Sequence, residues 1–104
     1  MIVNSWAELI DAPISTTAIR NLHPAEEGFR IFPNSYSAGV GFPVHIAIPC
    51  RVYVLAGKCS YKIDQNSALV DGGCYIDLEA GGYKFEVDKE GPVEIVKVFR
   101  IPQK

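Results

Sequence analysis

The sequence has no excess of one charge and no long apolar run, and each shortage excludes a class of protein. Its 104 residues carry 10 basic and 12 acidic side chains, a formal net charge of −2. A protein that binds nucleic acid through its phosphates normally carries a basic excess, so we expect no nucleic-acid partner. No apolar run approaches the roughly 20 residues needed to span a bilayer, so we expect no membrane segment.

Cysteine is also scarce. Cys50, Cys59 and Cys74 are odd in number and lack the close spacing of a structural zinc site. The N-terminal residues have neither the basic nor the apolar region of a signal peptide. We therefore expect reduced thiols and a cytoplasmic protein. A zinc site that combines these thiols with His45 stays open as an alternative.

What the sequence does contain is short segments rich in Val, Ile, Tyr and Phe, each bounded by turn-forming residues. Such segments are typical of strands, which we expect at residues 44–48, 51–56, 58–63, 74–78, 83–87 and 93–101. In three of them apolar and polar residues alternate, with Cys59, Tyr61 and Ile63, then Cys74, Ile76 and Leu78, then Tyr83, Phe85 and Val87 on the apolar faces. One apolar face per strand indicates antiparallel sheets around a core. The pattern predicts a single all-β domain over residues 1–104, a sandwich or barrel.

The N-terminal third is less regular. Ser5 and Glu8 fit a capping box, which predicts one short helical turn over residues 6–10. Two short strands are expected near residues 14–20 and 29–32, with a loop over residues 21–28 between them.

Two segments resemble the cupin superfamily. Residues 53–57, Tyr-Val-Leu-Ala-Gly, are similar to the string that follows the first cupin motif. Residues 73–81, which begin with Gly and end with Ala-Gly, match the spacing of the second motif. The resemblance covers roughly the C-terminal three-fifths of the chain. It implies a cupin-type double-stranded β-helix, that is, a jelly-roll barrel.

The same resemblance implies a metal site, and most of its ligands are absent here. The paired histidines of the family fall at Pro43 and His45, its glutamate at Cys50 and its last histidine at Lys84. One ligand of four retains its identity, which is too few for a divalent metal, so we expect no cofactor. Lys84 alternates with apolar neighbours and is expected to face solvent unless a bulge turns it inward.

A narrower resemblance is to the small metal-free cupins that act as pyrimidine/purine nucleoside phosphorylases. Residues 47–57 and residues 37–40 are similar to two of their strings. The acidic pair of that family is replaced by Cys50 and Arg51, and its Pro-Gly-His by residues 80–82. The resemblance therefore supports the fold and leaves the activity open.

We expect a metal-independent small-molecule-binding cupin that takes a polar ring-containing metabolite, of sugar or nucleoside type, in the barrel mouth. The candidate ligand-binding residues are His45, Arg51, Tyr53 and Lys84. His45 would bond a polar group at the mouth, while Arg51 and Tyr53 share a strand face and would supply a cation and a ring platform.

Two alternatives stay open. One is an enzyme, a nucleoside phosphorylase or a sugar epimerase or isomerase. A phosphorylase needs an anion pocket, for which Arg20, Arg30 and Arg51 are the available cations. The other is a non-catalytic structural or interaction protein that uses the barrel as a scaffold.

The strand edges of so short a barrel predict a homodimer, because exposed edges must be covered or paired. The irregular N-terminal segment, with Trp6, Ile10 and Ile14, is expected to lie across a partner's sheet. The strand phases also predict that Cys59 is buried and inert, whereas Cys50, near the mouth, reacts in the folded protein.

Overall fold

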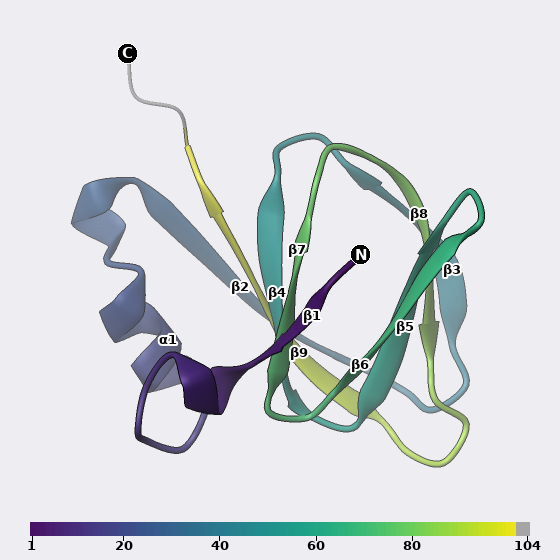
Figure 1. Ribbon diagram of the computed structural model, residues 1–104, viewed down its shortest axis with the longest axis horizontal. Helices are drawn as coiled ribbons and strands as arrows, with labels where there is room; N and C mark the ends of the chain where they lie inside the picture. The colour runs from purple at the N-terminus through teal and green to yellow at the C-terminus, as the bar shows by residue number, and fades with distance from the viewer. Residues whose placement is uncertain (102–104) are drawn as a thin grey trace.

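The computed structural model describes residues 1–101, in which two antiparallel sheets face each other (Figure 1). The first sheet, in spatial order, contains β1 (Val3–Ser5), β7 (Cys74–Leu78), β4 (Cys50–Ala56), β9 (Val93–Arg100) and β2 (Phe29–Tyr36). The second contains β3 (Gly41–Ile46), β8 (Gly81–Val87), β5 (Lys58–Ile63) and β6 (Asn66–Asp71). We call them the five-stranded and the four-stranded sheet. The predicted all-β jelly roll is confirmed.

The six strands expected from residue 44 onward are all present, with ends that differ by up to three residues. The sequence reading missed β6, whose Asn66 and Ser67 resemble turn residues. Ile63 pairs with Asn66, so Asp64 and Gln65 form a tight turn. Asp64 adopts a φ of 53°, a left-handed conformation that Asp tolerates better than most residues. A two-residue turn therefore stands where a longer one was expected, and β6 starts directly after it.

The prediction of a strand near residues 14–20 was wrong. Thr16–Leu22 form helix α1, and the side chain of Ser15 caps it by accepting a hydrogen bond from the backbone of Ala18 at 3.0 Å. The β-branched residues of this segment favour a strand, but the cap and the burial of Ile19 decide for a helix. The expected loop at residues 21–28 holds the end of α1 and a short 3₁₀ helix, η2 (Ala25–Glu27).

The helical turn expected near residue 6 is present as the 3₁₀ helix η1 (Trp6–Glu8). Its capping box is not formed, because Ser5 makes no side-chain hydrogen bond to the turn. Within the described residues, neither α1 nor the 3₁₀ helices have the length and apolar content to cross a membrane.

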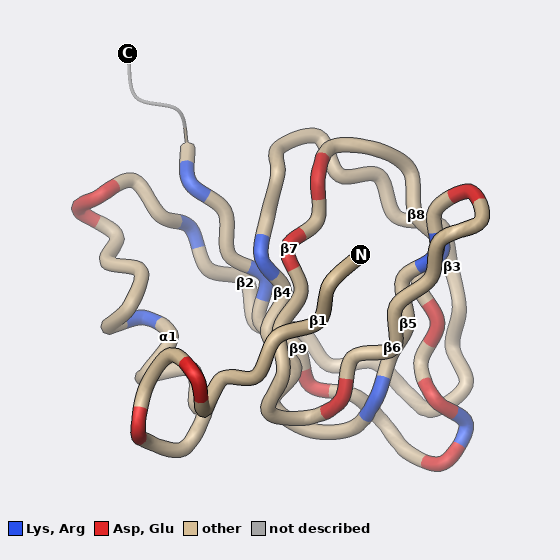
Figure 2. Tube along the Cα trace, in the orientation of Figure 1, with Lys and Arg blue, Asp and Glu red and all other residues tan. Residues whose placement is uncertain are grey.

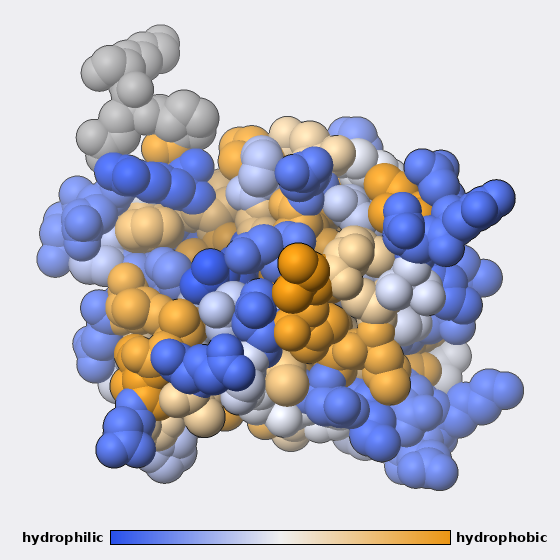
Figure 3. Space-filling view, in the orientation of Figure 1, coloured by the Kyte–Doolittle hydropathy of each residue, from blue (hydrophilic) through white to orange (hydrophobic). Residues whose placement is uncertain are grey.

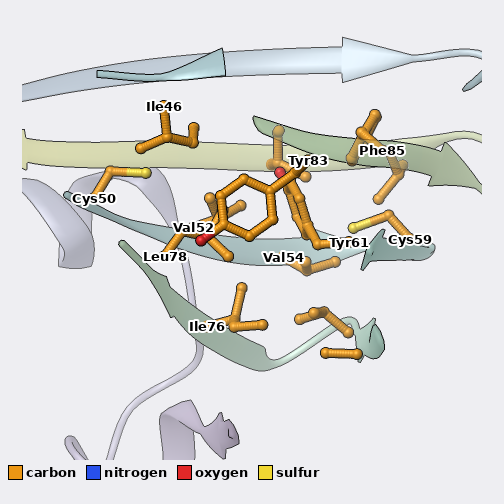
Figure 4. Packing of buried hydrophobic residues seen from close by; sticks show 14 of the residues in the cluster. Ile46, Cys50, Val52, Val54, Cys59, Tyr61, Ile76, Leu78, Tyr83 and Phe85 are labelled. Carbon is orange, nitrogen blue, oxygen red and sulfur yellow. The ribbon is translucent and has the colours of Figure 1, made fainter. Parts of the chain in front are cut away.

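The main core fills the space between the sheets (Figure 4). Cys59, Tyr61 and Phe85 point into it, as their alternation predicted. Phe85 contacts Tyr61 at a ring-centroid distance of 5.1 Å. Full burial of a side chain such as that of Phe85 contributes about 1.5–3 kcal/mol to folding. The register of β5 and β8, and with it the inward face of each, is thereby fixed.

A second, smaller core lies on the outer face of the five-stranded sheet. There the N-terminal segment and α1 cover Tyr53, Tyr75, Val96 and Val98. Trp6 is 3% exposed, and its indole Nε1 donates to the backbone oxygen of Ala12 at 2.8 Å. The N-terminal segment therefore packs on its own sheet, where we had expected it on a partner's sheet.

Candidate functional site

The open side of the barrel lies between β2 and β3, the end strands of the two sheets. Two adjoining cavities of about 180 Å³ and about 40 Å³ open there and share Ile46 and Lys97 as walls. We call them together the mouth groove. The rest of its wall is formed by Asn34, Tyr36, Phe42, Val44, His45, Ala47, Ile48, Cys50, Tyr61, Phe85, Ile95 and Phe99.

Lys97 brings a positive charge into this otherwise apolar space. It lies opposite Val52 of β4 on one side and Phe32 of β2 on the other, so it leaves β9 toward the barrel interior. Within residues 1–101, no carboxylate oxygen lies within 4.0 Å of its Nζ, the ion pairs being formed by other residues. The residue is half-buried, and its ammonium group has no protein counter-ion within that range.

Neutral polar groups share the groove with Lys97. Tyr61 is only 4% exposed, and none of the side-chain hydrogen bonds among residues 1–101 involves its hydroxyl. Among residues 1–101, Nδ1 of His23 is the one side-chain polar atom that is both inaccessible to solvent and without a hydrogen-bond partner. Since the Tyr61 hydroxyl also lacks a partner, it must be accessible, and the groove is the space that it lines. Asn34 lines the same cavity.

An aromatic pair borders the groove. The rings of Phe32 and Phe99 stack with centroids 5.4 Å apart and planes inclined by 13°. Phe99 lines the larger cavity, and Phe32 is 45% exposed beside it. Ile48, in the loop that joins β3 to β4, is also exposed and lines the larger cavity. A flat molecule that enters from solvent would meet these apolar faces first.

Comparisons with known proteins bear on this arrangement at the level of the fold. No family model matches the sequence, and no curated protein does. Among solved structures, the Cupin_2 domain of an XRE family transcriptional regulator from Enterobacter cloacae has a TM-score of 0.62 and 16% identity, over 79% of this chain and 93% of that one. A protein of unknown function from Streptococcus pyogenes has a TM-score of 0.61 and 22% identity, over 74% and 68%. A cupin superfamily protein from Desulfitobacterium hafniense has a TM-score of 0.61 and 13% identity, over 73% and 70%.

This chain has the cupin fold. The resemblance found in the sequence is confirmed to that extent, and the mouth groove lies on the open side of this barrel.

The cupin barrel places the four predicted ligand residues in different regions. His45 is exposed and lines the larger cavity of the mouth groove. Lys84 is exposed on the outer face of the four-stranded sheet, where its Nζ lies 3.2 Å from Glu86 Oε1. It faces solvent, as its alternation indicated.

The expected position of Arg51 and Tyr53 in the barrel mouth was wrong. They share one face of β4, but it is the outer face, because Cys50, Val52 and Val54 point into the core. β4 is covered on both faces, so its alternation of residues does not reveal which face is inward. Their placement at the mouth depended on that choice.

Arg51 instead belongs to a polar cluster outside the barrel. Its guanidinium makes two hydrogen bonds to Asp77, at 2.7 and 3.2 Å, and lies over the ring of Tyr75 at 4.3 Å. The hydroxyl of Tyr53 bonds both Arg51 Nη1, at 3.3 Å, and His23 Nε2, at 2.7 Å. Burial, and then the charge of Arg51, lower the pKa of His23. The cluster joins the end of α1 to the sheet.

The residues at the cupin metal positions do not fit a metal. His45 and Cys50 both line the larger cavity of the groove, but Lys84 lies on the outer face of the four-stranded sheet. Burial raises the pKa of the Cys50 thiol, which disfavours the thiolate that a metal would need. Across residues 1–101, no three His, Cys, Asp or Glu side chains come together in a group that could hold an ion.

Sequence reasoning missed the groove residues Asn34, Tyr61 and Lys97 as binding candidates. Lys97 had a usable signal, because Val93, Ile95, Lys97 and Phe99 alternate along β9 as one inward-facing series. A lysine in such a series is a candidate for a charge inside the barrel. Asn34 had none, because the predicted strand ended at residue 32.

Proposed function

We propose that the protein is a metal-independent small-molecule-binding cupin that holds a compact, polar ring-containing metabolite in the mouth groove. One observation carries the proposal: Lys97 and the Tyr61 hydroxyl, polar groups without a partner among residues 1–101, lie in a groove whose other walls are mainly apolar. Such a combination is typical of ligand sites, where apolar walls bury the ligand and a few polar groups orient it.

The size of the groove favours a small ring. Its larger cavity measures about 180 Å³, below the roughly 300–1,000 Å³ of drug-sized sites. A monosaccharide or another single-ring compound suits this volume better than a nucleoside does. The second ring system of a nucleoside would remain at the rim, against Phe32 and Phe99.

His45 remains in the proposal as a polar residue at the groove. Lys97, Tyr61 and Asn34 join it in place of Arg51, Tyr53 and Lys84, which face away. The three thiols are unpaired, which is consistent with the cytoplasmic setting that we propose.

The nucleoside phosphorylase alternative gains little support from the geometry. Arg20 and Arg30 do line one depression together, but it lies between α1 and β2, outside the barrel. Arg51 is committed to Asp77. A phosphorolysis site needs its anion pocket beside the nucleoside, so we propose binding as the primary function.

A thermal-shift screen followed by NMR tests the proposal. Monosaccharides, sugar acids, single-ring aromatic compounds and nucleosides would each be added with and without chelator. A compound present at about 100 times its dissociation constant should stabilise the fold by about 2.7 kcal/mol. Its amide shift changes should centre on β3, β9 and the loop between β3 and β4, equally with and without chelator.

Two results would count against the proposal. Shift changes confined to other surfaces would move the site away from the groove. Loss of binding in chelator would contradict metal independence, as would a stoichiometric metal bound through His45. The Lys84→Met variant, altered outside the groove, serves as the control and should bind like the wild type.

A further inference from the structure

The electrostatics of the mouth groove point to the class of its ligand. We propose that the groove binds a compact ring compound that carries a carboxylate, with the carboxylate paired to Lys97 and a flat face of the ring held against Phe99 and Ile48. The inference rests on the proposed function and names the chemistry of its ligand.

The charge balance of the groove comes first. In the described part of the chain, its walls contain Lys97 but neither Asp nor Glu. An anion that pairs with this ammonium group would gain a charge-assisted interaction. Figure 2 shows that most acidic positions lie in loops and near strand ends. The free groove is therefore set to attract a negative charge.

The neutral polar groups also suit an anion. A carboxylate accepts several hydrogen bonds through its two oxygens. Lys97 supplies ammonium donors, and the Tyr61 hydroxyl and the Asn34 amide line the same cavity as neutral donors. Because burial raises the pKa of Tyr61 far above neutral pH, its hydroxyl keeps the proton that it would donate. None of the three groups brings a negative charge that would repel the ligand.

A single cation selects among anions. Phosphate esters carry close to two negative charges at neutral pH and are usually held by several cations or backbone donors. Among residues 1–101 the groove offers one lysine, and Arg20 and Arg30 line a separate depression. One carboxylate matches one ammonium group, so a monoanion is favoured over a phosphate.

The body of the ligand follows from the larger cavity. Phe99, Ile48, Ile46 and Cys50 line it. Burial raises the pKa of the Cys50 thiol, so the thiol is neutral at physiological pH and acts as an apolar surface. Next to this wall the stacked pair of Phe32 and Phe99 provides a flat face at the rim. A ring that carries the carboxylate would bury its faces here.

Benzoate and benzamide form a matched pair of probes, because they share shape and differ in charge. Titration calorimetry on the full chain should show benzoate binding at least about tenfold more tightly than benzamide, a difference of about one charge-assisted interaction. Lys97→Met should abolish this preference while leaving benzamide binding similar, and Lys97→Arg should retain it. The Lys84→Met control should keep the wild-type preference.

The outcomes separate this inference from the proposed function. Equal affinity for benzoate and benzamide, with NMR shifts in the groove for both, would refute the carboxylate assignment and leave small-molecule binding standing. Binding of phosphate esters in preference to carboxylates would also refute it. If no ring compound of either charge perturbs the groove, both proposals fail. Should Lys97→Met not fold, the wild-type preference and the Lys97→Arg variant still decide.

Discussion

Lys97 lies directly opposite Val52 in the ladder between β4 and β9, so an ammonium group and a core valine leave their strands on the same side. Val52 is 1% exposed, whereas Lys97 is partly buried and lines the groove. The boundary between the closed core and the open mouth groove therefore lies between these two neighbouring strands. This boundary gives the barrel interior a charged group without placing it in the sealed core.

The hydroxyls of Tyr53 and Tyr61 should differ in their contribution to stability. Tyr53→Phe removes a hydroxyl bonded to both His23 and Arg51 and leaves the half-buried imidazole without that partner. We expect a loss of about 1–2 kcal/mol in the free energy of unfolding. Tyr61→Phe, the matched control in the core, should cost less than about 0.5 kcal/mol, because its hydroxyl lacks a protein partner among residues 1–101. Urea denaturation measures both, and equal losses would contradict the assignment.

The stability of the fold should fall in mildly acidic solution because of His23. Its folded pKa lies below the ordinary value of 6.5, chiefly through burial and then through the charge of Arg51, opposed by that of Asp77. Below 6.5 the unfolded chain therefore binds more protons than the folded chain, and the free energy of unfolding decreases until the folded pKa is reached. The contribution of His23 to the free energy of unfolding is fully present above pH 6.5.

Urea denaturation at about pH 7.5 and about pH 5.5 measures the stability on either side of pH 6.5. Both values lie above the pKa range of ordinary carboxyl groups. His23→Gln should flatten the pH dependence between these two values. The matched variant His45→Gln, whose side chain is exposed, should keep it. An unchanged slope in His23→Gln would show that another group carries the effect.

The strands that the sequence predicted well are those with one polar face. Cys59, Tyr61 and Ile63 alternate with Lys58, Ser60 and Lys62, so the inward face of β5 was predictable from the chain. β4 is different, because α1 and the N-terminal segment cover its outer face. Both of its faces are covered, the outer one with Tyr53 and Leu55 beside Arg51, and the tertiary structure decides that Val52 points inward and Tyr53 outward.

The same reason explains why the candidate site was only partly predictable. His45 was found because it stands at a motif position, and it does line the groove. Tyr61 was expected as core, and its burial gives no hint that its hydroxyl reaches a cavity. Asn34 approaches Lys97 only because β2 pairs with β9, a contact between distant parts of the chain.

The three thiols should react at different rates. Cys59 is 1% exposed, and burial raises its pKa to about 12, so it should react only on unfolding. Cys50 was expected to be accessible, but it is 7% exposed and its pKa is also raised by burial. Because it lines the groove, we predict slow labelling by iodoacetamide, which a groove ligand should slow further. Cys74 is only partly buried and should react first.

Peptide mass spectrometry after timed labelling gives the three rates separately. If Cys59 were labelled in the folded protein as fast as Cys74, this would contradict the inward orientation of Cys59 on β5. Labelling of Cys50 that a bound ligand leaves unchanged would place the ligand outside the groove.

We predict a homodimer, formed through the side of the barrel where β1 and β6 lie side by side as the end strands of their sheets. Ile2 is 77% exposed just before β1, and Leu69 is 59% exposed on β6. Figure 3 shows apolar surface over these two strands. An exposed strand edge beside apolar side chains favours pairing with a second copy, because the edge hydrogen bonds and the apolar area are then satisfied together.

Light scattering at micromolar concentration should give twice the chain mass of 11.4 kDa for the wild type. Leu69→Asp places a charge in the proposed interface and should give a monomer with an unchanged circular dichroism spectrum. Leu22→Asp is the matched control, because Leu22 is 37% exposed at the end of α1, away from β1 and β6. It should remain dimeric. A monomeric wild type would refute the dimer, and a dimeric Leu69→Asp variant would move its interface to another surface.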